Sequence, residues 1–288
     1  MPRAHFNPKE SKWAEPILRA LAQYPFLDSF HLYALIGTPY HQENARRAIN
    51  NLLTEKLIER IPNGQVGRSD RNDPWTLRLT PKGFTYLDER NLRPRPASYT
   101  NKPDQHNLLA NGALASFQLA FTKAAHRFIT LGDIVANAPE EIQELDRPDC
   151  FVLGERTWVT PDQVFSVDFG DDSYACFCLL LDLTNHGQTY YQREADYYRQ
   201  VVYDKIYQRQ FGMKQHMYVL YLCTNEPHMR NVQTWTGGDK IFLYKTMREY
   251  GSYQPAPEPA LKILAGWQGN HPNLGELYGH SKAAKVAR

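Results

Sequence analysis

The first ninety residues alternate between helical periods and turns in an order that few folds accommodate. Apolar residues recur at helical spacing over residues 13–22 and again over residues 45–58. Between these segments, Asp28 and Ser29 are N-cap residues for a short helix that residues 37–39, Gly-Thr-Pro, bring to an end. The pattern therefore predicts three helices, the last of which buries one apolar face.

A pair of short strands follows the third predicted helix. The strand-like runs are residues 57–61 and 75–79, and the turn-rich residues 62–74 separate them. The run Leu-Thr-Pro-Lys-Gly at 79–83 then opens a capped helix with proline in its first turn. Three helices, two strands with a long polar tip and this ending resemble the winged helix-turn-helix superfamily. The resemblance implies that residues 10–90 form a domain that binds double-stranded DNA.

The resemblance makes the third helix the recognition helix and the polar tip the wing. In such a domain, polar and cationic side chains of the helix reach phosphates or base edges in the major groove, and arginines of the wing reach the backbone or minor groove. The candidate DNA contacts are Gln42, Asn44, Arg46, Arg47 and Asn50 on the helix, and Arg68 and Arg71 on the wing.

The distribution of charge agrees with a nucleic-acid partner for the front of the chain. The net charge is only +2, but residues 1–100 hold 15 Lys/Arg against 10 Asp/Glu, and the remaining residues hold 18 against 21. The excess positive charge therefore lies at the front end. With 288 residues and 42% apolar residues, the chain is expected to form about two folded domains.

Several classes of protein are not expected. No apolar run approaches the roughly 18 residues that span a membrane, and the first residues lack the apolar core of a signal peptide. We therefore expect a cytoplasmic protein without a membrane partner. The cysteines, at 150, 176, 178 and 223, lack paired C-x-x-C spacing and are interpreted as buried thiols instead of zinc ligands.

The rest of the chain predicts an α/β domain. Residues 91–106 contain three prolines among polar residues and are interpreted as a linker. Beyond them, residues 107–250 alternate types and predict a mixed sheet; residues 251–288 form a Pro-rich and polar tail. The predicted helices are 106–125, 190–211 and 226–236, and the predicted strands are 163–167, 174–181, 217–222 and 240–244.

Two aspartates of this domain stand at strand ends. Asp162 follows a proline where one strand begins, and Asp182 ends the most apolar strand. The pair resembles the PD-(D/E)xK nuclease-like fold, in which two such acids hold Mg²⁺ and a lysine two residues past the second assists the attacking water. Here that position is Thr184, and no lysine occurs between Lys123 and Lys205. The catalytic set is incomplete, so the domain is predicted to be non-catalytic.

The order of all these segments over residues 10–250 is similar to that of the replication-relaxation family. These proteins join a winged helix to a nuclease-like domain and assist plasmid replication and conjugative mobilisation. In that family the apolar strand usually ends in an E-x-D-like pair, of which this chain keeps only the first acid, Asp182.

Three hypotheses follow. The first is a sequence-specific double-stranded DNA-binding accessory or regulatory protein of a plasmid or mobile element. It would act in replication, mobilisation or transcription control without cleavage or cofactor, as a homodimer that contacts a relaxase or replication protein. The second is a Mg²⁺-dependent endonuclease or nickase with Asp162 and Asp182 as metal ligands. The third is a scaffold whose winged helix binds protein.

Overall fold

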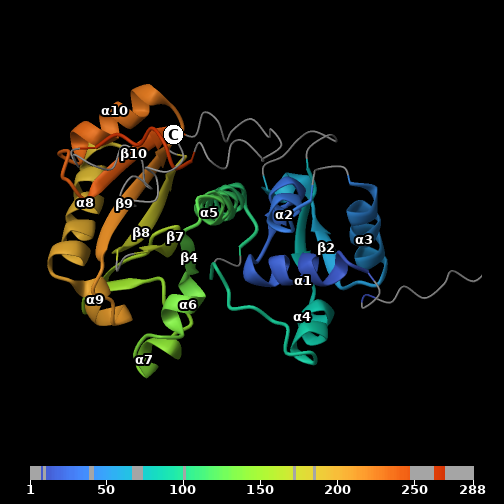
Figure 1. Cartoon of the computed structure of the whole chain (residues 1–288). Helices are drawn as coiled ribbons and strands as arrows, with labels where there is room; N and C mark the ends of the chain where they lie inside the picture. Colours follow the sequence, from blue (N-terminus) through green and yellow to red (C-terminus); the bar gives the residue numbers. More distant parts are fainter. Residues whose placement is uncertain are drawn as a thin grey trace, which may run out of the picture. The chain divides into compact units, whose positions relative to one another are not determined.

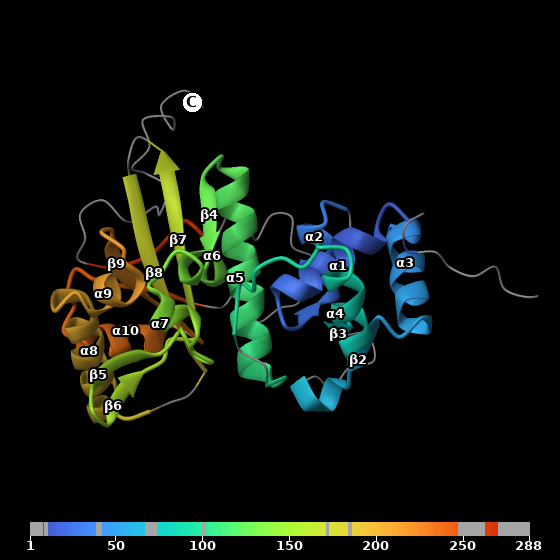
Figure 2. The same cartoon turned by 90° about the horizontal axis from the view of Figure 1, so that it is seen from below.

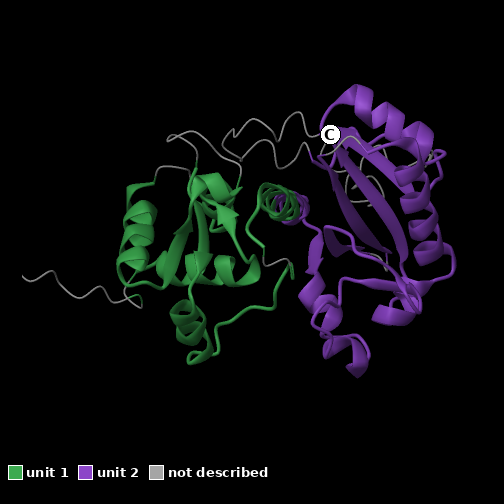
Figure 3. Ribbon diagram, turned by 180° about the vertical axis from the view of Figure 1, so that it is seen from behind, with its two compact units in different colours: residues 1–115, 255–257 green, residues 116–254, 258–288 purple. Residues whose placement is uncertain are grey.

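The computed structural model describes residues 8, 11–38, 42–66, 74–99, 102–170, 173–183, 186–246 and 263–269. The chain is of the mixed α/β class, as predicted, with helices and mixed sheets. It divides into two compact units, shown in Figure 3: residues 1–115 with 255–257, and residues 116–254 with 258–288. The division falls inside helix α5, and each unit is described by itself.

Unit 1 contains a small antiparallel sheet and the helices around it (Figure 1). Its strands pair in the order β1-β3-β2, so β2 lies at an edge. The helices are α1 (Ala14–Gln23), α2 (Ser29–Leu35), α3 (Glu43–Thr54) and α4 (Pro81–Asp88), with the short 3-10 turn η2 (Asn63–Val66). The strands are β1 (Leu27–Asp28), β2 (Ile58–Ile61) and β3 (Thr76–Leu79).

Two helices of unit 1, α2 and α4, start where the capping residues predicted. Asp28 caps α2 because its carboxylate accepts a hydrogen bond from His31 N at 2.9 Å. Thr80 caps α4 in the same way through Gly83 N, with Pro81 in the first turn. The core of unit 1 includes a cluster of the buried Phe26, Ile61, Val66 and Leu108.

Unit 2 is built on a mixed sheet of five strands in the order β10-β9-β8-β7-β4. Its helices are α5 (Gln105–Lys123), shared with unit 1, α6 (Leu131–Val135), α7 (Glu140–Gln143), α8 (Gln188–Tyr203), α9 (Ile206–Phe211) and α10 (Glu226–Trp235). Its strands are β4 (Arg127–Thr130), β5 (Phe151–Gly154), β6 (Thr157–Val159), β7 (Gln163–Gly170), β8 (Ser173–Asp182), β9 (His216–Cys223) and β10 (Phe242–Thr246).

The five-stranded sheet has an antiparallel part and a parallel part. Strands β4, β7 and β8 are antiparallel neighbours, whereas β8, β9 and β10 run parallel and are joined by helical crossovers. Figures 1 and 2 show α8 and α10 on one face of the sheet and α5 on the other. The antiparallel pairing brings the beginning of β7 beside the end of β8, which is where both candidate aspartates lie.

Aromatic residues fill the face of the sheet that α5 covers. Phe117 lies 5.0 Å from Phe165 between ring centroids, and Phe165 lies 5.1 Å from Phe177. All three are fully buried, so α5 is held on the sheet by close-packed rings.

Several features differ from the sequence-based expectations. The single helix predicted at 190–211 is two helices, because Lys205 adopts a left-handed conformation with φ of 56°. Strands β1 and β4, helix α6 and the β5–β6 hairpin were not predicted. Residues 263–269, assigned to the polar tail, contribute the buried Ile263, Leu264 and Trp267 to unit 2.

The cysteine prediction is confirmed in three of four cases. Cys176, Cys178 and Cys223 are buried, and Cys150 is half-buried. Burial raises the pKa of Cys176 to about 12, so this thiol is unreactive at neutral pH. Among the described helices, none is long and apolar enough to cross a membrane.

Candidate functional site

Helix α3 divides into a buried apolar face and an exposed polar face. The buried residues are Ala45, Ala48, Ile49 and Leu52. The exposed ones include four of the five predicted helix contacts, Asn44, Arg46, Arg47 and Asn50. The fifth, Gln42, is the half-buried N-cap residue and accepts a hydrogen bond from Thr38. The helical period therefore brings the predicted polar residues to the surface.

The two arginines of α3 form few and weak ion pairs with the described residues. Arg47 Nη2 lies 3.7 Å from Glu43 Oε1, and both side chains are about two-thirds exposed, at 68% and 69%. Such an exposed pair is worth roughly 0–1 kcal/mol and exchanges readily for another anion. Arg46 has no ion pair within the described ranges. Both guanidinium groups can therefore bind a phosphate or base edge at little cost.

The wing residues cannot be placed in the same way. Arg68 and Arg71 lie outside the described residues, which stop at Val66 and resume at Pro74. The strands that flank them, β2 and β3, pair from Ile58 opposite Leu79 to Ile61 opposite Thr76.

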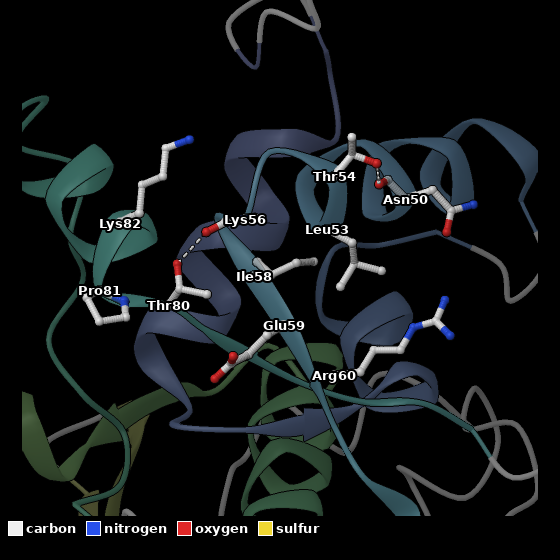
Figure 4. Close-up of a pocket in the computed structure, with 10 residues that line it drawn as sticks. All are labelled: Asn50, Leu53, Thr54, Lys56, Ile58, Glu59, Arg60, Thr80, Pro81 and Lys82. Carbon is white, nitrogen blue, oxygen red and sulfur yellow. Dashed lines mark hydrogen bonds between the residues drawn. The ribbon is translucent and has the colours of Figure 1, made fainter.

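Arg60 is an exposed cation near α3 that the sequence analysis missed. Its guanidinium carbon lies 3.3 Å above the ring of Trp75, from the start of the neighbouring strand. This cation–π contact holds the side chain in one orientation, and desolvation by the same packing lowers its pKa. Figure 4 shows Arg60 and Asn50 pointing to the same side. Alternation along β2 puts Arg60 on the face of the buried Ile58, so no sequence signal marks it as exposed, and only the tertiary structure brings it beside α3.

Asp162 in unit 2 lies where the antiparallel pairing predicts. Its backbone N–H donates to Leu179 O at 3.0 Å, and its carboxylate Oδ2 accepts from Leu181 N at 2.6 Å. The carboxylate thus binds the backbone of β8 one residue before Asp182. The structure brings the two predicted aspartates to the same edge of the sheet.

Asp182 is buried and already hydrogen-bonded. Its Oδ2 accepts from Tyr191 Oη at 2.8 Å and lies 2.6 Å from His228 Nε2. Tyr191 Oη is also 3.2 Å from His228 Nε2, so the three side chains form a closed triad. The exposed fraction of the Asp182 and His228 side chains is 6% and 7%. Sequence reasoning missed His228 and Tyr191 as partners because they come from separate helices.

Glu194 adds a third carboxyl group on α8. Its Oε1 accepts from Tyr190 Oη at 3.1 Å and its Oε2 from Tyr221 Oη at 2.9 Å. Desolvation raises the pKa of Glu194 from 4.5 to about 7, and the negative charges of Asp162 and Asp182 act in the same direction. The two hydrogen bonds lower the pKa, but desolvation outweighs them. Because the folded-state pKa is raised, this group contributes stability at low pH that is lost as the pH rises through about 7.

Tyr198 carries a buried hydroxyl in this region. Tyr198 Oη is buried on α8, and no hydrogen-bond partner for it occurs among the described residues. Leaving a buried hydroxyl unpaired costs roughly 1–3 kcal/mol. Among the described residues, the hydrogen-bond network of unit 2 therefore includes Asp182 and leaves out Tyr198 Oη.

Metal-ligating residue types do not gather in the described part of unit 2. Within the described ranges, no three His, Cys, Asp or Glu side chains are grouped as metal ligands would be. The position expected for the nuclease lysine, Thr184, lies outside them. No family model matches the chain, and the comparisons with curated proteins and with solved structures give no match. The function of the chain is therefore inferred from the geometry of each unit.

Proposed function

We propose that the chain is a sequence-specific double-stranded DNA-binding protein that acts without cleavage. In this proposal, unit 1 is a winged-helix domain and α3 is its recognition helix. The observation that carries it is the division of α3, whose exposed face holds Asn44, Arg46, Arg47 and Asn50 while its opposite face is buried. A helix so presented offers cations and amide groups to a major groove.

The topology of unit 1 supports this proposal. Its elements follow the order helix, strand, two helices, two strands, with a three-stranded antiparallel sheet. This order is the one expected of a winged helix, in which α2 and α3 form the helix-turn-helix. Arg60, held by Trp75, adds a cation beside Asn50 and is a natural phosphate contact.

Unit 2 supports a role in assembly. Its antiparallel strands followed by parallel strands are compatible with a nuclease-like domain, but Asp182 already accepts hydrogen bonds from two buried partners. A carboxylate committed in this way is a structural group. We infer that unit 2 contacts a second copy of the chain, or a relaxase or replication protein. The whole would serve as a cytoplasmic accessory or regulatory protein of a plasmid or mobile element.

The test replaces Arg46 and Arg47 with alanine. A duplex selected from a random pool by the wild-type protein is titrated, with fluorescence anisotropy as the readout. The double variant is expected to bind about 100-fold more weakly. The slope of log affinity against log salt concentration should become shallower by about two, because two phosphate contacts are lost.

The matched control removes the same charge from unit 2. Arg127 and Arg193 are exposed there, and the Arg127→Ala, Arg193→Ala variant should bind within about twofold of wild type. Equal affinity of the Arg46/Arg47 variant and wild type would contradict the recognition-helix assignment. No binding of any duplex at low salt would favour the scaffold hypothesis, in which unit 1 binds protein.

A second candidate function is a Mg²⁺-dependent nickase. It is favoured by one observation: the Asp162 carboxylate accepts a hydrogen bond from Leu181 N, directly before Asp182, and the charges of both aspartates raise the pKa of Glu194. Mg²⁺ prefers carboxylate oxygens, and Glu194 could complete a ligand set if Asp182 were released from His228.

We expect no nicking of supercoiled plasmid by the purified protein with Mg²⁺ or Mn²⁺, as followed on agarose gels. Two near-isosteric variants, Asp162→Asn and Glu194→Gln, separate a real activity from a contaminating nuclease. Nicking by wild type that both variants abolish would overturn the non-catalytic assignment. Nicking that persists in both variants would identify a contaminant and leave the expectation in place.

A further inference from the structure

Unit 1 has a surface pocket of about 840 Å³ between the end of α3, strand β2 and the start of α4. We call it the β2 pocket (Figure 4). Its lining contains three apolar residues, Leu53, Ile58 and Pro81, and three cationic residues, Lys56, Arg60 and Lys82. Figure 4 shows the Lys82 and Arg60 side chains on opposite sides of Leu53 and Ile58. The pocket is thus an apolar surface with cations at both ends.

The cationic residues of the β2 pocket are not neutralised by its acidic residue. Its acidic lining residue, Glu59, is engaged elsewhere, because its Oε1 lies 2.5 Å from Arg78 Nε. Lys82 Nζ donates to the backbone oxygen of Glu55 at 2.7 Å, and Arg60 lies over Trp75. Neither of these two residues, nor Lys56, has an ion pair among the described residues. The pocket therefore favours an anion.

The chemistry of the lining points to a small ligand more than to the DNA backbone. Phosphates are recognised by cations and N–H groups and gain nothing from Leu53, Ile58 and Pro81. Ligand pockets, by contrast, are mostly apolar with a few placed polar groups and measure roughly 300–1,000 Å³. The β2 pocket has such a volume, and it places the apolar Leu53, Ile58 and Pro81 beside seven polar or charged residues, so that it offers contacts to an apolar body and to a charged group.

We propose that the β2 pocket binds a small organic anion with an apolar body, its acid group between Lys56 and Lys82. The binding itself is independent of the proposed function. Its regulatory consequence depends on that function: α3 supplies both Leu53 to the pocket and the predicted DNA contacts. A ligand that shifts the end of α3 against β2 would therefore change the affinity for DNA.

The test uses two fluorescent probes that share one ring system. Anilinonaphthalene sulfonate carries an acid group, and phenylnaphthylamine lacks it. In titrations of the full chain, the Lys56→Glu, Lys82→Glu variant is expected to bind the sulfonate about tenfold more weakly, because two attractive charges become repulsive. Its affinity for the uncharged probe should stay within about twofold of wild type. Lys82→Glu loses the hydrogen bond from Lys82 Nζ to Glu55 O but places an acid in the first turn of α4, where it is favourable, and the uncharged probe reports whether the pocket stays folded.

A charge-matched control places the same substitutions in unit 2. Lys123 and Lys240 are exposed there, and Lys123→Glu, Lys240→Glu should leave the affinity for both probes unchanged. Hydrogen–deuterium exchange should show protection by the sulfonate in peptides that cover residues 50–60 and 80–82. Three results would overturn the proposal. The control variant could lose as much sulfonate affinity as the Lys56/Lys82 variant, the Lys56/Lys82 variant could lose affinity for both probes equally, or the sulfonate could protect peptides elsewhere in the chain.

The final arm separates this proposal from the DNA-binding proposal. Saturating sulfonate should change the affinity of the wild type for its selected duplex and should have no effect on the Lys56/Lys82 variant. If the wild type binds no duplex, the DNA-binding proposal fails while the probe titrations still decide whether the pocket binds an anion. If DNA binds and the sulfonate leaves its affinity unchanged, the regulatory consequence is wrong.

Discussion

Replacing Asp182 with alanine is expected to lower the free energy of unfolding by about 3–5 kcal/mol. The substitution leaves Tyr191 and His228 buried without their shared acceptor, Asp182 Oδ2. Neither side chain can turn to water, because Tyr191 on α8 and His228 on α10 are both buried. Urea denaturation of the full chain, followed by circular dichroism, measures the loss.

Two variants in the same region serve as comparisons. Asp182→Asn keeps one acceptor oxygen and should lose less than half as much stability as alanine. Tyr198→Phe removes a hydroxyl that has no partner among the described residues, so stability should stay the same or rise. If Asp182→Ala and Tyr198→Phe unfold at the same urea concentration, the triad does not stabilise unit 2.

Gly83→Ala should destabilise unit 1 by about 3 kcal/mol, at the upper end of overpacking effects. A Cβ at this position would lie 2.2 Å from the backbone oxygen of Leu57 and 2.7 Å from Leu79 Cδ2. The first clash is with backbone, which cannot move without breaking the hydrogen bond from Thr80 N to Leu57 O. The glycine therefore permits α4 to begin directly against the strand pair. Thermal unfolding by calorimetry should show an earlier transition.

Gly64→Ala provides the control for this prediction. A Cβ at Gly64, in η2, meets nothing within 4 Å, so the transition should stay within about 1 °C of wild type, as expected for a surface change. An unchanged transition in Gly83→Ala would mean that α4 packs further from β2 than the structure has it.

The local elements of unit 1 were predictable because their signals are local. Asp28 and Thr80 cap α2 and α4 through residues three positions away, and the apolar period of α3 selects the face that carries Arg46 and Arg47. The helix of residues 106–125 was also predicted from its period, but its burial by the rings of unit 2 was not.

Short or contradictory signals explain what was missed. Strand β4 and the β5–β6 hairpin are as short as β2 and β3, but no alternation of buried apolar residues marks them: the burial of β4 does not alternate, and the hairpin exposes Val152 and Trp158. The break between α8 and α9 depends on the left-handed conformation of a single residue, Lys205. A lysine in the sequence does not predict that conformation. Trp267 lies among many polar residues, and for that reason the stretch around it was assigned to the tail.

The sequence by itself determined the α/β class, most helix starts, the exposed face of α3 and the placement of two aspartates at strand ends, because each depends on residues within a few positions. Only the tertiary structure decided what those residues meet. The partners of Asp182 are 9 and 46 residues away, on two helices. Arg60 on the edge strand β2 packs over Trp75 and lines one pocket with residues of α3, and that pocket combines three elements. Side-chain partners at such separations depend on strand pairing and helix packing, and no local period encodes them.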